Sequence, residues 1–393
     1  MIQTSDSMDA LEPFSLLGGP LHRIGCRLGL VRGGTDTLGL GVALALLAWG
    51  ILILLALLCG VGARVFSLSV IGGHVRLLVA IPLFFLCETW VVPRMAEFVR
   101  EIVQSGLVPD TALPALAGDV RRVGRLKDSW LAEVVFLLLA VCLPLAEKYT
   151  QLSGATGSWS VLLVRSGQGL TWVSGWYLAF CLPLYRLLVL RWLWRLGLWS
   201  WFLWRLRRLG LRLVPTHPDG AAGLGFLEVV HEHFVPLVAG ISAVCSAGLA
   251  GEIAAGAVAF QMLYRLAPFI LAVMAALFIG PLCVFTPALW RCRVTGWSDY
   301  MAMASRYVAA FDRRWVQDGK ATGEAQLGTP DLQSLADLAN SVDKVRNVRW
   351  IPAGRRLLTG LAAAALAPLS PLLLFEYPAA DLLKRLLSAL TGL

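Results

Sequence analysis

The chain has 393 residues, of which 58% are hydrophobic and only 15% are charged, and its mean hydropathy is +0.71. Soluble domains are about 25% charged, so the composition excludes an ordinary soluble protein and favours one that lies mostly in lipid. The net charge of +9 does not require nucleic acid as a partner, because orientation in a membrane and anionic headgroups on the cytoplasmic side explain it.

The first predicted element is a membrane-spanning helix within residues 37–63, a run without a charged side chain. It exceeds the roughly 20 residues that cross a bilayer. Similar stretches predict six spans at 38–62, 77–98, 130–149, 168–189, 234–256 and 267–290. A weaker segment at 357–376 spans or re-enters, and an amphipathic helix follows it. The predicted fold class is all-α, a polytopic membrane protein with six to seven transmembrane helices plus cytoplasmic and interfacial amphipathic helices.

Basic residues predict the orientation, because short loops rich in Lys and Arg stay cytoplasmic. With these spans, 26 Lys and Arg fall on one side, 7 on the other, and Arg186 lies inside a span. The N-terminus is therefore expected in the cytoplasm. The predicted domains are a cytoplasmic segment at 1–37, a six-helix transmembrane domain at 38–290, a cytoplasmic helical hairpin at 291–354, and a seventh segment with the C-terminal helix at 355–393.

The second span contains Glu88 and the fourth contains Arg186. An ionised side chain in hydrocarbon is expensive unless it is paired or faces water. Glu88 is therefore a candidate for permeation or proton relay, and Arg186 is a possible partner, although the sequence does not show that the two meet.

Residues 99–129 predict a helix that lies on the membrane surface or extends the bundle. Between spans four and five, tryptophans alternate with arginines. On a helical wheel five of these arginines share a third to a half of the circumference: Arg191, Arg195, Arg205, Arg208 and Arg212. The favoured interpretation is an interfacial helix whose arginines contact lipid phosphates. A basic vestibule for anions is the alternative, and a nucleic-acid surface is strongly disfavoured.

The segment before span five carries the densest group of reactive side chains. His217 and Asp219 lie in a turn rich in Pro and Gly, and Glu228, His231 and Glu232 share one face of the helix that follows. The favoured interpretation is structural, a helix-start turn and a polar interface segment. A proton relay or ion gate, and a site for Zn²⁺ or another divalent metal, are the alternatives. No pattern indicates an organic cofactor.

Spans five and six combine small residues with prolines. Ala239, Ala243, Ala247 and Gly251 recur every fourth position, and span six contains three prolines. Small residues permit close helix approach, and proline kinks free carbonyls that bind water or ions. Both features are compatible with a pore.

The hairpin at 291–354 is predicted from two helical patterns. The first follows Ser298, and the second has Thr329 as N-cap and Pro330 at the first position. Packing of these helices against each other is favoured over a subunit interface.

The stretches HPDGAAGLGFLE (217–228) and DLQSLADLANS (331–341) resemble motifs of a family of uncharacterised bacterial integral membrane proteins. The resemblance implies a bacterial inner-membrane location and no chemistry. From the residues we expect a homo-oligomeric ion channel or solute transporter. The alternatives are a membrane enzyme acting on a lipid-linked or phosphate-bearing substrate at the cytoplasmic face, and an accessory structural subunit.

Overall fold

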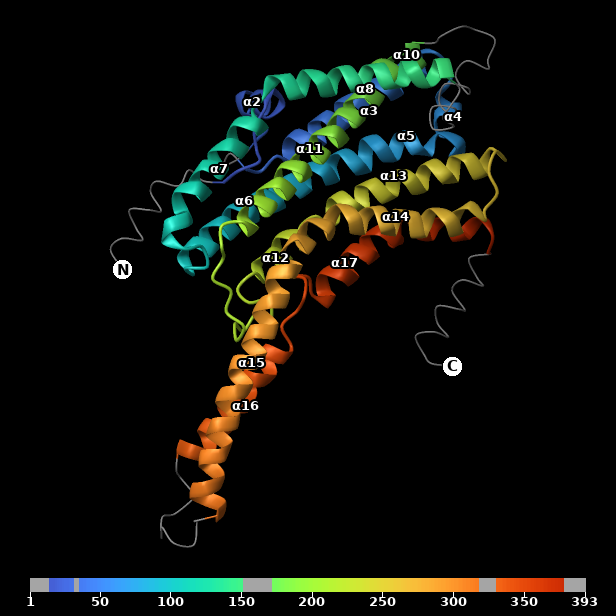
Figure 1. Ribbon diagram of the computed structural model, residues 1–393. Helices are drawn as coiled ribbons and strands as arrows, with labels where there is room; N and C mark the ends of the chain where they lie inside the picture. The colour runs from blue at the N-terminus through green and yellow to red at the C-terminus, as the bar shows by residue number, and fades with distance from the viewer. Residues whose placement is uncertain (1–13, 32–34, 151–171, 318–329, 378–393) are drawn as a thin grey trace.

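The computed structural model describes residues 14–31, 35–150, 172–317 and 330–377 (Figure 1). Across these ranges the chain folds into helices and has no β-strand. The all-α fold class predicted from the sequence is confirmed.

The first half of the chain contains α2 (Pro20–Arg27), α3 (Leu38–Leu58), α4 (Gly62–Val65), η1 (Leu68–Val70), α5 (Ile71–Val75), η2 (Arg76–Ala80), α6 (Ile81–Gln104), η3 (Asp110–Ala112), α7 (Leu113–Lys127) and α8 (Trp130–Thr150). The second half contains α10 (Trp172–Trp176), η4 (Tyr177–Cys181), α11 (Leu182–Arg207), α12 (Phe226–Glu232), α13 (Val235–Ala254), α14 (Met262–Phe278), η5 (Gly280–Phe285), α15 (Thr286–Phe311), η6 (Asp312–Gln317), α16 (Pro330–Arg346), α17 (Arg355–Leu366) and η7 (Ala367–Phe375).

Five continuous helical stretches in the described part of the chain are long and apolar enough to cross a membrane: Leu38–Leu58, Ile71–Gln104, Trp172–Arg207, Phe226–Ala254 and Arg355–Phe375. A sixth is formed if α14 and the helix after it count as one span, although the two are bent by 48°. By length and composition, these helices are consistent with an integral membrane protein. The segment at 357–376, predicted only weakly, is among them.

The third predicted span, 130–149, agrees with the bounds of α8, Trp130–Thr150. Two other predicted boundaries differ from the structure. The fourth does not end at residue 189, because α11 continues through the arginines to Arg207 instead of giving way to a separate interfacial helix. The sixth is interrupted near Gly280, where Pro281 supplies no N–H to continue the α-helix.

The buried core lies where α6, α11 and α13 meet. Phe84, Phe98, Trp199 and Phe202 are almost completely buried there. The helices approach closely where a side chain is absent: a Cβ on Gly41 of α3 would lie 2.6 Å from the Phe85 side chain of α6. The α3, α6, α11, α13, α14 and α17 helices run side by side through the body of the molecule in Figure 1.

The hairpin predicted at 291–354 is formed by α15 and α16, which project together from the body (Figure 1). The first helix begins at Thr286, not after Ser298, so it continues directly from the bundle. The second helix is described from Pro330 onwards, and the predicted N-cap Thr329 lies outside the described residues. The Tyr307 hydroxyl donates to the Asp331 carbonyl at 3.0 Å, and Trp315 Nε1 donates to the Asp331 carboxylate at 3.0 Å. The two helices therefore pack against each other.

Candidate functional site

Glu88 lies in the interior of α6, with a side chain only 7% exposed. Its Oε1 accepts a hydrogen bond of 2.8 Å from Nη2 of Arg195, whose side chain is also 7% exposed. The partner of Glu88 is therefore Arg195 of α11, rather than the Arg186 considered from the sequence. Arg186 lies earlier on α11 and is partly buried.

Arg191 extends this charged group by one helical turn of α11. Its Nη2 donates to the Gly18 carbonyl at 2.9 Å and lies 3.9 Å from Oε1 of Glu133 on α8. The two buried arginines thus connect three helices and the N-terminal segment. We call Glu88, Glu133, Arg191 and Arg195 the intramembrane charge cluster.

The segment Phe14–Gly19 covers the charge cluster. Phe14 packs on Trp199 and Phe202, with ring centroids 5.7 and 4.7 Å apart, and Leu16 is fully buried beside Arg195. No helical pattern or motif predicted this contact, because a segment of six residues without regular secondary structure has no periodicity to recognise.

The five arginines expected to share one phosphate-binding face are divided among different environments. Arg191 and Arg195 are buried in the charge cluster, and Nε of Arg205 donates to both oxygens of Asp119 on α7 at 3.1 Å. Arg208 and Arg212 are exposed; the Arg208 guanidinium lies 3.6 Å from the Trp204 ring centroid. Arg212 lies beyond the end of α11, so it does not belong to the predicted helical face.

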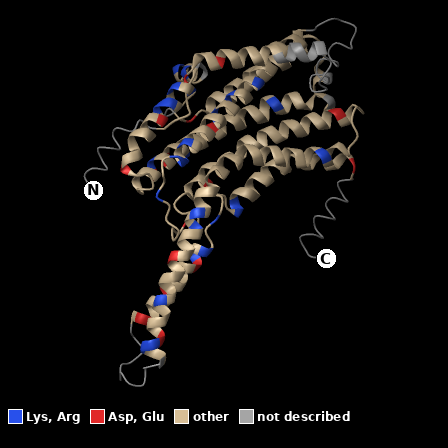
Figure 2. Cartoon of the chain, viewed as in Figure 1, with Lys and Arg blue, Asp and Glu red and all other residues tan. Residues whose placement is uncertain are grey.

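Sequence reasoning missed a basic surface on α7. Leu116, Val120 and Val123 bury one face of this helix, and Arg121, Arg122 and Arg125 are exposed on the other. Figure 2 shows Lys and Arg positions gathered around α2 and α7, whereas the α15–α16 hairpin carries both basic and acidic positions. The amphipathic spacing of α7 was visible in the sequence, but only the structure shows which face is covered.

The predicted turn at His217 and Asp219 is built around the Asp219 carboxylate. It accepts hydrogen bonds from the backbone N–H groups of Ala221 at 2.8 Å, Gly223 at 3.1 Å and Gly225 at 2.7 Å, and His217 Nδ1 lies 2.9 Å from it. Burial alone would raise the pKa of Asp219, but these N–H groups and His217 stabilise the anion and the pKa is lowered. The positive φ of Gly223, +101°, explains glycine there.

The three polar residues of α12 contact three different elements. Glu228 accepts a 2.5 Å hydrogen bond from Arg349, which follows α16, and Glu232 lies 3.4 Å from Arg356 of α17. His231 is completely buried: its Nε2 accepts from Trp199 Nε1 at 3.1 Å, so its Nδ1–H donates to the Phe278 carbonyl at 2.6 Å.

Arg349 also joins the turn to the base of the hairpin. It donates from Nη2 to the Asp219 carbonyl at 2.7 Å, and its backbone N–H donates to the Gly220 carbonyl at 2.9 Å. The residues from His217 to Glu232 are therefore engaged in holding helices together. No group of three or more His, Cys, Asp or Glu in the described ranges is arranged to hold a metal ion.

Comparison of the chain with protein-family models, curated proteins and solved structures finds no match.

Proposed function

We propose that the protein is a membrane transport protein, a channel or solute transporter, whose permeation path passes the intramembrane charge cluster. The observation that carries this proposal is the ion pair between Glu88 and Arg195, buried between two helices long enough to span a membrane. Ionisable residues in such helices are rare and are typical of ion pathways and proton relays.

Stability does not account for the pair. Desolvation of two charges costs about as much as their attraction returns, and well-packed apolar residues often replace such pairs without loss. A second buried arginine beside the pair adds to this cost, because Arg191 and Arg195 carry like charges. This expense supports a functional role for the cluster.

The segment Phe14–Gly19 closes the path in the conformation described. It contributes the Gly18 carbonyl to Arg191 and buries Phe14, Leu16 and Leu17. Transport then requires this segment to move, which exposes the cluster to water. The contacts of Phe14 are aromatic and apolar, so they release without breaking an ion pair.

Flux through reconstituted protein tests the proposal. Liposomes containing the wild-type protein are expected to pass ions or protons under a pH gradient or an applied voltage. Glu88→Gln is expected to change the flux at least tenfold, because it removes the charge that faces Arg195. Glu97→Gln is the matched control, since Glu97 lies on the same helix in an exposed pair with Arg94. Leu16→Ala is expected to increase the flux.

No flux from well-folded wild-type protein at any pH or voltage would contradict transport. Equal flux from the Glu88→Gln and Glu97→Gln variants would contradict a path past the charge cluster. The geometry favours transport over an enzyme acting on a phosphate-bearing substrate, because Asp219, Glu228 and His231 are already committed to contacts within the protein.

The proposal includes a homo-oligomer in a bacterial inner membrane, with the N-terminus in the cytoplasm and anionic headgroups on that side. The exposed arginines of α7 support the headgroup contact, since Trp130 and Leu131, exposed apolar residues, follow directly at the start of α8. Mass measurement of the detergent-solubilised protein tests the oligomeric state.

A further inference from the structure

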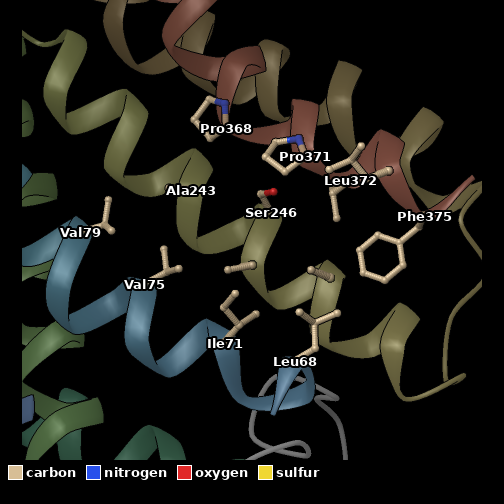
Figure 3. Close-up of a pocket in the computed structure, with 13 residues that line it drawn as sticks. Leu68, Ile71, Val75, Val79, Ala243, Ser246, Pro368, Pro371, Leu372 and Phe375 are labelled. Carbon is tan, nitrogen blue, oxygen red and sulfur yellow. The ribbon is translucent and has the colours of Figure 1, made fainter. Parts of the chain in front are cut away.

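A cavity of about 560 Å³ opens between α5, α13 and η7 (Figure 3). None of the residues that line it belongs to the charge cluster. This volume lies within the range of about 300–1,000 Å³ found for small-molecule sites. Its walls are apolar: Ile71 and Val75 on one side, Ala243 and Ala247 on the second, and Pro371 on the third.

The sequence explains why these helices do not close on each other. Alanines on α13 leave room on its surface, and prolines at 368 and 371 end the α-helical geometry of α17 and start the 3-10 helix η7. Proline has no N–H and clashes with the preceding turn, so the α-helix does not continue along α13.

One end of the cavity opens at the surface of the transmembrane body. Leu68, Leu374 and Phe375 lie at this end, with side chains 51%, 57% and 40% exposed. In a membrane these side chains face hydrocarbon, because they belong to or flank helices of spanning length and composition. A ligand therefore enters sideways, from the lipid.

Ser246 is the polar residue of the cavity wall. It is only 6% exposed, and its hydroxyl has no hydrogen-bond partner among the described residues. Figure 3 shows its oxygen directed into the space between α13 and η7. One turn earlier on the same helix, the Ser242 hydroxyl donates to the Ala365 carbonyl. An unpartnered hydroxyl in the wall of an apolar cavity indicates a ligand that supplies an acceptor.

We propose that this cavity binds one acyl chain of a membrane phospholipid, with the ester carbonyl accepting a hydrogen bond from Ser246. Ser246 lies one helical turn, about 6 Å, from Ala250 at the open end, so a carbonyl reaches it while the headgroup stays outside. The chain then runs between Val75 and Ala243. This site is independent of the proposed transport path, and its test measures lipid rather than flux.

The test uses phosphatidylcholine whose second chain carries a photoactivatable diazirine. The full-length protein is reconstituted with this lipid, solubilised, exchanged into lipid-free detergent and then irradiated. Loosely held lipid is removed by the exchange, so label is expected on peptides containing residues 243–250 and 371–375 and not on the exposed leucines of α3.

Three variants define the site. Ala243→Leu with Ala247→Leu fills the cavity and is expected to abolish the label, whereas Ala272→Leu on the exposed surface of α14 is the matched control and retains it. Ser246→Ala is expected to weaken lipid retention about threefold to tenfold, the effect of one neutral hydrogen bond, and Ser246→Thr to restore it.

Equal labelling of wild type and the cavity-filled variant would overturn the proposal, as would label spread equally over α3. A cross-link that joins two copies of the chain at this groove would also overturn it, because the cavity would then be a subunit interface.

Discussion

Among single residues, Arg195 depends most on its hydrogen-bond partners, because its charge is buried beside that of Arg191. Two cations in this position are tolerated only while Glu88 and the Gly18 carbonyl accept their hydrogen bonds. Removal of Glu88 alone is therefore expected to change the free energy of unfolding differently from removal of both Glu88 and Arg195.

Glu88→Leu leaves Arg195 buried without its carboxylate, and we expect the free energy of unfolding to fall by about 3–5 kcal/mol. Replacement of both residues, Glu88→Leu with Arg195→Met, is expected to recover most of this loss. The thermal midpoint of the detergent-solubilised protein measures the difference. A double variant less stable than Glu88→Leu alone would show that the pair is needed for folding rather than tolerated.

Asp219 gives a pH dependence with a defined sign. Its pKa is lower in the folded protein than in the unfolded chain, so the stabilisation is fully present above the unfolded value of about 3.9 and is lost as the pH falls through the folded value. Asp219→Asn is expected to lower stability by about 1–2 kcal/mol at pH 7, the value of a charge-assisted hydrogen bond. The gap between wild type and variant should close below pH 4 in denaturation measurements. Asp343→Asn, on exposed α16, should show no such gap.

At the scale of helices, the break between α14 and η5 is the main irregularity of the bundle. Because Pro281 has no N–H and the Leu282 N–H bonds to Ile279, the Phe278 carbonyl loses its helical partner. His231 donates to this carbonyl and accepts from Trp199. One imidazole therefore supplies hydrogen-bond partners both to the carbonyl at the helix break and to the N–H of a buried indole. The bend is thus stabilised by a side chain from another helix.

His231→Leu leaves the Phe278 carbonyl and the Trp199 N–H without partners. Each buried unsatisfied group costs about 1–3 kcal/mol, so we expect the two to cost about 2–6 kcal/mol in total. Faster hydrogen exchange is expected in residues 279–286, measured by mass spectrometry. His233→Leu is the control, because the His233 imidazole bonds to the Val229 carbonyl one turn earlier and packs edge-on against Trp90, away from the helix break. Unchanged exchange in the His231 variant would show that the bend does not depend on it.

The sequence predicted most helices and missed the contacts that connect them. Apolar runs are local features, and the helices predicted from them agree with the structure. The end of span four was placed before Arg191 because a charge normally marks the edge of hydrocarbon. Its charge is instead satisfied by Gly18 and Glu133, residues distant in the sequence. The partner of Glu88 was missed for the same reason, since no local pattern records which helices face each other.

Across the whole molecule, the position of the charged residues predicts how it sits in a membrane. The basic surface of α7, the arginines at the end of α11 and the α15–α16 hairpin all follow spans that the sequence directs towards the cytoplasm. The turn between α13 and α14 carries few charges. It lies at the end of these two helices that is away from the α15–α16 hairpin (Figure 1). The positive-inside rule therefore predicts that this turn lies outside.

Cysteine labelling tests this orientation. In a variant whose 8 native cysteines are replaced, Ala257→Cys lies in the exposed turn after α13 and Ser334→Cys lies on the exposed surface of α16. A membrane-impermeant maleimide is expected to label residue 257 in intact cells and residue 334 only in inverted vesicles. Labelling with the opposite sidedness would reverse the orientation and place the basic surface of α7 outside. Labelling of both positions from one side would mean that the bent segment between them, α14 with η5 and α15, does not cross the membrane, which would remove the sixth span.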